Sequence, residues 1–373
     1  MKLLLSSILY YPSRLGGPAN TLYWLSKGLV RAGVDVKVVT TTRHIDDKRV
    51  LPDTWIDLDG IKVRYCKDSH DFPFKVIHHT IKDLRQSDIL MLCDLFQRQN
   101  LTLALSAKFR RIPMIWSPRG ELFPSAMGDS KLKKLYVKAI KFLFKKNTYF
   151  HATSEKEAEL IRNYIGADSR IKVIPNYMEL PPKMPHEQGG DNYFLFLGRI
   201  APIKAIENLI EALALSQIFK SSNYILKIAG GVEDQFKDYY RHLVAMVNEF
   251  GLTDKVLFVG AVNGEEKYRT YANARMMFLV SKSENFGNVV IESLSQGTPV
   301  TASQGTPWDS LSKTGAGYWI NNSPENIKSV IDKVIQMPEN EYINMRNNAF
   351  ELSHKYDIYH NIDKWSDYLS EIV

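Results

Sequence analysis

Two glutamates in the C-terminal half of the chain have the types and the spacing of a pair that binds hydroxyl groups. Glu284 and Glu292 stand eight positions apart, in a segment that predicts a strand over 276–280 and a helix over 288–296. We expect Glu284 on the connecting loop and Glu292 about one turn inside the helix. The first turn of such a helix offers unpaired N–H groups and the positive end of the helix dipole, which together bind anions. The arrangement fits a diphosphate that carries a sugar at each end.

Two cations lie at another strand-to-helix turn of the same half. Arg199 and Lys204 follow a predicted strand over 193–197 and adjoin a predicted helix over 205–215. A diphosphate suits this pair, because both side chains neutralise its charge and a guanidinium can bind it in a bidentate way. Solvated side chains without a ligand are the alternative interpretation of each pair taken alone.

Two further strands of this half end in glycine. Gly230 follows a predicted strand over 225–229, and Gly260, with Val262 two positions later, ends another that begins at 256. Ligands of open α/β sheets bind where the parallel strands end. We therefore expect these residues at the same sheet edge as Glu284.

The N-terminal half repeats the pattern with different residues. Gly16 and Gly17 precede a helix predicted over 19–32, and two glycines let backbone amides approach a ligand closely. Arg119 follows a predicted strand over 113–117, where a parallel sheet places its ligands. A plain tight turn and an ordinary surface arginine are the alternatives for these two features.

The elements that would position these residues alternate between strands and helices in both halves, which predicts an α/β protein with two Rossmann-like, doubly wound domains. The chain has 373 residues, enough for two cores. We assign residues 1–178 to the first domain and 190–356 to the second, with a proline-rich linker containing Gly189 and Gly190 between them. The aromatic tail, 357–373, is expected to pack back on the first domain.

Composition excludes several classes of protein. The two cysteines, Cys66 and Cys93, form no disulfide or metal pattern, which favours a reducing cytoplasm. The apolar start of the chain is too short for a signal peptide and predicts a first strand instead. Charge is uneven, because residues 1–178 carry +13 and the remainder −6.

Much of the positive charge lies in one segment. Residues 131–146 contain seven lysines, in a pattern that predicts an amphipathic helix. Such a helix can lie on an anionic membrane surface, and a half-buried helix with solvated lysines is the alternative. Nucleic-acid binding is not favoured, since no stacking aromatics are interleaved with the basic residues. The apolar residues expected on one face are Leu132, Leu135, Tyr136, Ala139, Phe142 and Leu143.

Taken in order, these residues resemble the retaining glycosyltransferases of the GT-B architecture, in the group-4 family whose C-terminal domain is called "glycosyl transferases group 1". The run from Ser283 to Glu292 is similar to the family's E-x7-E motif. The resemblance covers nearly the whole chain and is stronger in the second domain. The other segments that carry it are Pro12 with Gly16 and Gly17, Ile174 to Asn176, Gly198 and Arg199 with Lys204, and Ile228 to Gly231.

The resemblance implies roles for the matched residues. Arg199 and Lys204 would neutralise the donor diphosphate, Glu284 would accept hydrogen bonds from the donor sugar, and Glu292 would hold the ribose. Backbone contacts to sugar and phosphate would come from Phe286, Gly287, Asn288 and Val289. The segment from Gly260 to Val262 would flank the base, Gly230 would line the same site, and Gly16 and Gly17 would close over the phosphates from the other domain. Arg119 stands near the position where many members carry a histidine, so its implied role is a contact to the sugar or to an acceptor phosphate.

The implied fold is two Rossmann-like domains facing a central cleft, and the implied reaction is transfer of a sugar from a UDP- or GDP-linked donor with retention of configuration. The implied acceptor is a glycan or a lipid-linked oligosaccharide of bacterial surface polysaccharide, such as lipopolysaccharide. The expected enzyme is cytoplasmic, peripheral on the inner face of the membrane, and needs neither metal nor cofactor; the segment from Asp57 to Asp59 is expected to be a turn. The alternative is a nucleotide-sugar-binding or epimerase-type GT-B protein without transferase activity.

Overall fold

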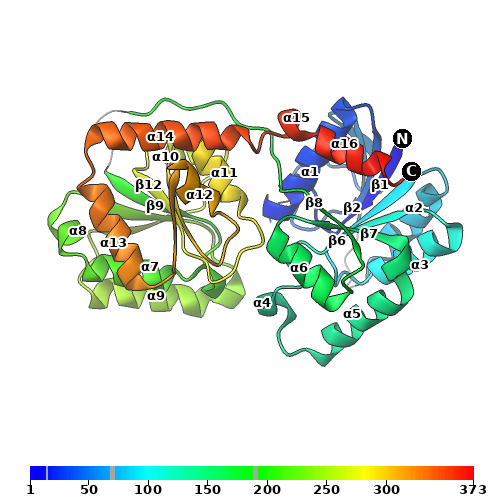
Figure 1. Ribbon diagram of the computed structural model, residues 1–373, viewed down its shortest axis with the longest axis horizontal. Coiled ribbons are helices and arrows are strands. Elements are labelled where there is room, and N and C mark those ends of the chain that lie inside the picture. Colours follow the sequence, from blue (N-terminus) through cyan, green and yellow to red (C-terminus); the bar gives the residue numbers. More distant parts are fainter. Residues whose placement is uncertain (14–15, 68–71, 188–191) are drawn as a thin grey trace. The chain divides into compact units, whose positions relative to one another are not determined.

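A computed structural model describes residues 1–13, 16–67, 72–187 and 192–373 of the chain (Figure 1). The predicted linker glycines, Gly189 and Gly190, lie outside the described residues, and so does the predicted start of the second domain at residue 190.

The chain divides into two compact units. Unit 1 comprises Met1–Glu179 together with Asp357–Val373, and unit 2 comprises Leu180–Tyr356. Each unit is built on one sheet of largely parallel strands, joined by helices that cover its faces (Figure 1). The prediction of two doubly wound α/β domains is confirmed.

Unit 1 contains an eight-stranded sheet in the order β3-β4-β2-β1-β5-β6-β7-β8. All neighbours are parallel except the antiparallel pair β3–β4 at one edge. The strands are β1 Lys2–Ser6, β2 Asp35–Thr41, β3 Trp55–Leu58, β4 Ile61–Cys66, β5 Ile89–Cys93, β6 Met114–Ser117, β7 Thr148–Ala152 and β8 Arg170–Val173. The helices are α1 Gly16–Arg31, α2 Phe74–Leu84, α3 Asn100–Arg110, α4 Pro124–Met127, α5 Lys131–Phe144, α6 Glu155–Tyr164, α15 Ile358–Asn361 and α16 Asp363–Ser370, with a 3₁₀ turn at Lys145–Asn147.

Unit 2 contains a six-stranded, wholly parallel sheet in the order β11-β10-β9-β12-β13-β14. The strands are β9 Tyr193–Leu197, β10 Ile225–Ala229, β11 Val256–Gly260, β12 Met276–Leu279, β13 Val300–Ser303 and β14 Gly317–Ile320. The helices are α7 Ile206–Leu215, α8 Gln217–Ser221, α9 Lys237–Glu249, α10 Gly264–Ala272, α11 Asn288–Ser295, α12 Ser310–Thr314, α13 Pro324–Ile335 and α14 Glu339–His354, with 3₁₀ turns η2 Pro202–Lys204 and η3 Asp234–Phe236.

The central strands are buried on both faces, which explains their nearly continuous apolar sequences. All five residues of β5 are buried, and β12 is buried throughout. In β9, Phe194 and Phe196 point into the core formed with α7, α9 and α13. Leu195 is equally buried but lies outside that cluster, since successive side chains of a strand point to opposite faces. The helices on both sides therefore hold the strand ends in fixed register.

In both sheets the strand order reverses at one position. In unit 1 the chain builds outward from β1 on one side, then returns to start the other side with β5. In unit 2 the same reversal separates β9 from β12. Loops leave the carboxyl ends of two such strands in opposite directions, which opens a crevice where α/β proteins bind ligands.

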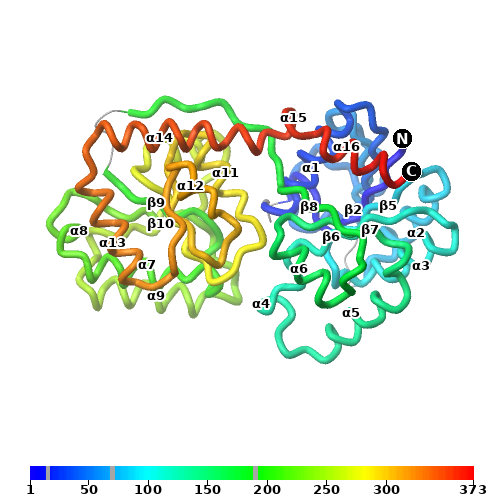
Figure 2. The backbone as a smooth tube through the Cα atoms, viewed as in Figure 1, coloured from blue at the N-terminus to red at the C-terminus, as the bar shows by residue number. Residues whose placement is uncertain are grey.

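The C-terminal tail belongs to unit 1. A parallel bridge joins Met178 to Asp357, and the Ile358 N–H donates to the Met178 carbonyl at 2.9 Å. The Tyr368 hydroxyl donates to the Phe150 carbonyl of β7 at 3.1 Å. Figure 2 shows α15 and α16 beside α1, where Gly28 allows close packing: a Cβ at this position would lie 2.7 Å from Cγ1 of Ile358. The tail thus supplies part of the core of unit 1.

The lysine-rich helix α5 differs from its expected packing. Val137, Ile140 and Phe144 fill the core of unit 1, and Tyr136 and Leu143 are only partly buried. The other large apolar residues of the predicted face are exposed: Leu132, Leu135 and Phe142. The helix therefore has a second apolar stripe that was not predicted, Val137, Ile140 and Phe144, and it rests on the core through this stripe, on the side away from Leu132, Leu135 and Phe142. Among the described residues, no helix has both the length and the hydropathy needed to cross a bilayer.

Replacing Leu369 with Ala should destabilise unit 1. Leu369 is fully buried in the tail, so the substitution leaves a cavity and should lower the free energy of unfolding by about 2–5 kcal/mol. The midpoint of urea unfolding measures the change. The neighbouring exposed Ser370→Ala is the matched control and should stay within about 0.5 kcal/mol of wild type. Equal midpoints for Leu369→Ala and Ser370→Ala would show that the tail does not contribute to the core.

Candidate functional site

The turn that carries Glu284 is shaped by a glycine. Gly287 caps α11 with a φ of +87°, and a Cβ there would lie 2.8 Å from Cδ2 of Leu279. Only glycine fits this left-handed, crowded position without strain. The preceding Phe286 is buried against Trp308, whose indole N–H donates to the Phe286 carbonyl. The turn therefore delivers the chain into α11 at Asn288, where a helix was predicted to begin.

Glu284 lies in direct contact with Lys204. Their side chains form a short ion pair and are 20% and 14% exposed, respectively. Lys204 ends η2 after β9, and Glu284 follows β12, so the two loops leave neighbouring strands at the reversal point of the sheet. The Lys282 N–H donates to the Ile203 carbonyl at 2.8 Å and ties these loops together. The loops after β9 and β12 therefore offer an anion one cation, Lys204, and the N-terminus of α11, with the Glu284 carboxylate beside them.

Glu292 is buried inside α11 and is held by two donors that sequence reasoning missed. The Lys267 ammonium pairs with its Oε1 at 2.8 Å, and the Tyr271 hydroxyl donates to its Oε2 at 3.1 Å. Although desolvation opposes the charge of Lys267, the Glu292 carboxylate raises the pKa of that ammonium. Lys267 and Tyr271 stand one turn apart on α10, a spacing that places them on one face. Nothing in the sequence indicated which element that face would meet.

Arg199 pairs with a carboxylate that sequence reasoning did not identify. Its guanidinium is 61% exposed and pairs with Glu233 at 3.0 Å. Glu233 follows β10, the neighbour of β9 on the side away from β12. Arg199 and Lys204 thus flank the end of β9, each with its own carboxylate.

The predicted glycines of unit 2 have unequal environments. A Cβ on Gly230 would lie 1.8 Å from the Gly198 carbonyl oxygen, and the Gly230 N–H donates to the Gly260 carbonyl at 2.8 Å. Gly230 is therefore required for the close packing of three strand ends. Gly260 has a φ of +78° and is exposed, and Val262 is half-buried nearby in sequence. Asn288 and Val289, in the first turn of α11, are also half-buried.

The carboxyl edge of the sheet in unit 1 carries Arg119 and a residue that sequence reasoning missed, Asp94. Asp94 directly follows β5, and Arg119 comes two residues after β6; the two strands pair through Cys93 and Ser117. Both have left-handed backbones, with φ of 50° for Arg119 and 60° for Asp94. Such strain in residues other than glycine is concentrated at functional sites. Asp94 could have been found as the first polar residue after the predicted strand that ends at Leu92.

Two glutamates hold the turn of Arg119, and of these Glu157 is buried and Glu121 is half-buried. Glu157 accepts hydrogen bonds from the Gly120 N–H at 2.6 Å and from the Thr153 N–H at 2.8 Å. Glu121 accepts from the N–H groups of Leu95 and Phe96. Burial raises the pKa of both carboxyls, that of Glu121 to about 7 with a further contribution from Asp94. These contacts fix the loops after β5 and β6 relative to one another.

Arg119 lines a small pocket within unit 1. Its Nε is buried and has no hydrogen-bond partner among the described residues. The other lining residues come from α1, from the segment after β8 and from the C-terminal tail: Thr21, Leu25, Pro175, Asn176, Tyr177, Ile358 and Trp365. A ligand with an anionic or carbonyl oxygen would satisfy the guanidinium there.

The glycines at the start of α1 lie inside the helix. Gly16 and Gly17 form its first turn, whereas a loop was predicted, because the helix begins before the predicted Ala19. Pro18 is tolerated so near the N-terminus, where its missing N–H has no helical partner. Gly17 is exposed, and a Cβ there would meet no atom within 4 Å. Packing therefore does not require glycine at this position.

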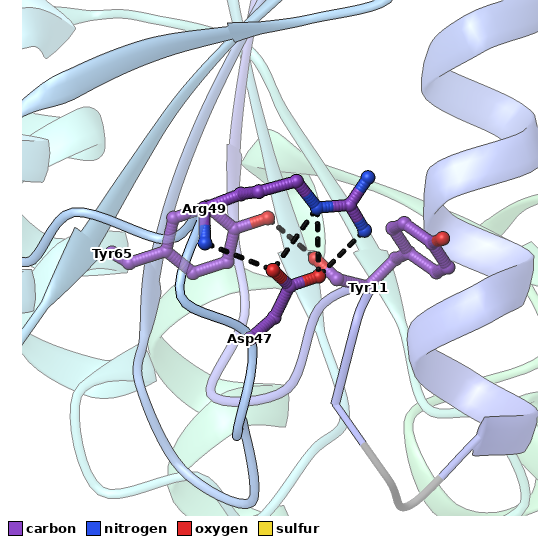
Figure 3. Close-up of polar contacts among 4 residues, drawn as sticks. All are labelled: Tyr11, Asp47, Arg49 and Tyr65. Atoms are coloured by element: carbon purple, nitrogen blue, oxygen red, sulfur yellow. Dashed lines mark hydrogen bonds and ion pairs between the residues drawn. The ribbon is translucent and has the colours of Figure 1, made fainter.

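The loops around the start of α1 are tied at the same sheet edge (Figure 3). The Tyr65 hydroxyl, at the end of β4, donates to the Tyr11 carbonyl in the loop after β1. Beside them, Asp47 accepts from the backbone and the guanidinium of Arg49, which lowers the pKa of Asp47 to about 2. The loop after β1 is thus held by the strand two places away.

The described residues contain no group of three or more His, Cys, Asp or Glu that could hold a metal ion. The segment from Asp57 to Asp59 was predicted to be a turn, but Asp57 and Leu58 end strand β3 and only Asp59 lies in the turn that leads to β4. The Asp57 carboxylate accepts from the Gly60 N–H at 2.9 Å.

Comparison with known proteins identifies the two halves separately. Residues 182–352 match the family "Glycosyl transferases group 1", and residues 16–177 match the "Glycosyl transferase 4-like domain". The fold resembles that of HepE from Anabaena in a crystal structure with UDP and glucose, with a TM-score of 0.81, 18% identity and full coverage of both chains. At this identity the likeness concerns the fold alone, which is of the GT-B type.

Two curated relatives differ in how much they share. The uncharacterized glycosyltransferase MJ1607 of Methanocaldococcus jannaschii is 32% identical over 50% of this chain, and the match spans only 45% of that relative. The GDP-mannose:cellobiosyl-diphosphopolyprenol alpha-mannosyltransferase of Xanthomonas oryzae pv. oryzae is 25% identical over 96% of this chain and 93% of its own length.

Lowering the pH should destabilise unit 1 through His151. Its Nε2–H donates to the Ile174 carbonyl and its Nδ1 accepts from the Ser117 hydroxyl, both at 2.8 Å, so the buried ring is neutral. Burial, followed by the charge of Arg119, lowers the pKa of His151 to about 3. The unfolded chain binds this proton near pH 6.5, so the folded state loses about 2 kcal/mol between pH 7 and pH 5.

Urea unfolding of wild type and His151→Gln at both pH values measures this contribution. The raised pKa values of Glu121 and Glu157 act in the opposite direction, and they cancel in the comparison of the two proteins. The variant should lose less stability than wild type on acidification. An equal loss in both proteins would contradict the assignment of this pH dependence to His151.

Proposed function

We infer that the chain belongs to the group 1 GT-B glycosyltransferases, since its two halves match glycosyl transferase domains and its two-domain fold resembles that of a GT-B structure. We propose that it transfers a sugar from a nucleotide-diphosphate sugar to a glycan or lipid-linked acceptor, with retention of configuration. The observation that carries the proposal is the Lys204–Glu284 ion pair beside the N-terminus of α11, at the reversal point of the second sheet.

Donor binding exchanges the partners of this ion pair. Lys204 turns from Glu284 to the diphosphate, and the released carboxylate accepts hydrogen bonds from hydroxyls of the donor sugar. Arg199 makes the same exchange from Glu233, which is favourable because its present pair is exposed and therefore weak. The two cations and the dipole of α11 then stabilise the charge that develops on the leaving diphosphate. Backbone groups of Phe286, Gly287, Asn288 and Val289 line the path between sugar and phosphate.

Glu292 binds the ribose of the nucleotide. Lys267 and Tyr271 orient this carboxylate, and a carboxylate has acceptor positions beyond those two donors. Gly260 and Val262 flank the base. A uridine or guanosine donor agrees with the neighbours, since the HepE structure holds UDP and the Xanthomonas relative is named for GDP-mannose.

The acceptor is bound by unit 1. Arg119, with its unsatisfied Nε and its place in a pocket, suits an acceptor phosphate or sugar oxygen, and Asp94, whose carboxylate interacts electrostatically with Arg119, suits a hydroxyl. A lipid-linked glycan of surface polysaccharide, including lipopolysaccharide, is supported by the named acceptor of the Xanthomonas relative. Such an acceptor places the enzyme at the cytoplasmic face of the membrane, in contact with anionic lipid through the segment 131–146.

The chemistry requires no metal and no protein nucleophile. Cations and amide dipoles take the place that a metal occupies at other diphosphate sites. The acceptor hydroxyl attacks the anomeric carbon on the face that the diphosphate leaves, and the departing phosphate oxygen receives the proton. A nucleotide-sugar-binding or epimerase-type protein without transfer is the alternative.

Loss of either cation should abolish most turnover. Arg199→Ala and Lys204→Ala remove charge from the leaving diphosphate, so kcat/KM should fall by about 100-fold or more in each. Lys204→Arg, which keeps the charge, should retain more activity than Lys204→Ala. Lys237→Ala on α9 is the control, because this exposed lysine forms an ion pair with Asp234 at the surface. Rates near wild type in both alanine variants would refute the site.

A second measurement separates an enzyme from a binding protein. The donor is first chosen as the UDP-, GDP- or ADP-linked sugar that most raises the melting temperature of the protein. Slow hydrolysis of that donor without acceptor, unchanged by excess EDTA, is the expected result, since no step uses a metal. Stabilisation by the donor with no hydrolysis or transfer would favour the binding protein, and loss of activity in EDTA would refute metal independence.

A further inference from the structure

Two helices of unit 1 present apolar side chains to solvent on one surface. On α5 these are Leu132, 80% exposed, Leu135, 63%, and Phe142, 89%. On α3 they are Leu105, 50% exposed, and Phe109, 88%. We refer to these five residues as the α3–α5 face. From it we infer that unit 1 inserts side chains of both helices into the interface of an anionic phospholipid bilayer, which goes beyond the surface contact of the 131–146 segment proposed above.

Helical geometry places the exposed residues of α5 in one stripe. Leu132, Leu135 and Phe142 lie at positions i, i+3 and i+10, within one quarter of the helix circumference. The buried residues Val137, Ile140 and Phe144 form a second stripe on the side of the helix away from it, so the core does not use the exposed stripe. These side chains are therefore available to an external apolar phase.

Three lysines of α5 form a row along one side of the exposed apolar stripe. Lys134, Lys138 and Lys141 follow at intervals of four and three, and all three are exposed. Lys134 lies 3.9 Å from Asp129, whereas Lys138 and Lys141 have no ion pair among the described residues. No Asp or Glu occurs in α5 itself. A cationic row beside an apolar row is the pattern of helices that lie in a membrane interface.

Helix α3 extends the surface. The Lys108 ammonium donates to the Leu143 carbonyl at 2.7 Å and joins the C-terminal turns of the two helices. Phe109 follows Lys108, Phe142 precedes Leu143, and Leu105 lies one turn before Phe109. Figure 1 shows α3 and α5 as neighbours at the periphery of unit 1. The two phenylalanines of the face, Phe109 and Phe142, are thus each next in sequence to a residue of the Lys108–Leu143 hydrogen bond.

The lysines and the apolar side chains of the α3–α5 face together indicate what binds to it. A second copy of the chain would bring the same lysines against this surface, and like charges repel. A nucleic acid would engage the lysines and leave the leucines and phenylalanines in water. An anionic bilayer satisfies both rows, because its headgroups neutralise lysines while its acyl boundary takes up the apolar side chains.

Flotation of the full-length protein with vesicles tests the inference. The wild type should bind phosphatidylcholine vesicles that contain anionic phosphatidylglycerol, and bind pure phosphatidylcholine at least about tenfold less. Phe109→Ser with Phe142→Ser should lower binding to the anionic vesicles about tenfold or more, because inserted apolar area is lost. The reversed charges Lys134→Glu, Lys138→Glu and Lys141→Glu should also abolish it.

Matched variants in unit 2 control for general loss of surface apolarity. Leu215→Ser with Ile343→Ser removes two other exposed apolar side chains, 44% and 48% exposed, and should leave binding unchanged. Melting temperatures near wild type establish that the exposed substitutions do not unfold the chain.

Three results would overturn the inference. The wild type does not bind anionic vesicles, or the phenylalanine variant binds them as well as the wild type does. The third result is that the wild type self-associates with rising concentration and the phenylalanine variant does not. Donor-induced stabilisation and donor hydrolysis are measured without vesicles on the same proteins. Failure of membrane binding is therefore distinguishable from failure of the proposed transfer.

Discussion

The candidate site depends on one ion pair between two loops of the parallel sheet in unit 2. Lys204 and Glu284 are eighty positions apart, and they meet because β9 and β12 are neighbours at the point where the strand order reverses. Both charges are largely withdrawn from water, so separating them without a replacement is unfavourable. A ligand that displaces the pair must offer an anion to the lysine and donors to the glutamate at the same time. A diphosphate joined to a sugar is such a ligand, and this requirement excludes many simpler anions.

Paired charges also occur at the proposed nucleoside end of the site. Glu292 is buried, and its charge is balanced by Lys267 and supported by Tyr271. Arg199, by contrast, remains exposed and is paired with Glu233 at the surface. The site thus combines one rigid acid with cations whose present partners are replaceable. Such a division suits the proposed donor. Its nucleotide must be bound tightly before transfer, and the nucleoside diphosphate must be released afterwards.

Unit 1 uses two acids, one buried and one half-buried, for a different purpose. Glu121 and Glu157 accept backbone N–H groups of the loops that carry Asp94 and Arg119, and they hold these two residues in left-handed conformations. Neutral His151 lies beneath the turn, packed on Trp365 of the C-terminal tail at 4.5 Å between ring centroids. Through this contact the tail packs against the region of the Arg119 loop. Trp365 of the last helix also lines the pocket that contains Arg119. The surplus positive charge of this half lies largely elsewhere, on α5.

The sequence by itself determined the two α/β domains, the strands that precede the site and the start of α11 at Asn288. Those features depend on local patterns: apolar runs for buried strands, and Gly287 before a helix. The meeting of Lys204 with Glu284 was also predictable in outline, because carboxyl ends of parallel strands share one sheet edge.

Only the tertiary structure decided which side chains meet across elements. The pairing of Lys267 with Glu292, the partner of Arg199, the packing role of Gly230 and the exposed stripe of α5 each depend on how helices and strand ends are placed relative to one another. Periodicity identifies the apolar residues of a helix, but it does not say which of them the core will cover. That choice is made by the shape of the neighbouring elements, which lie far away in the sequence.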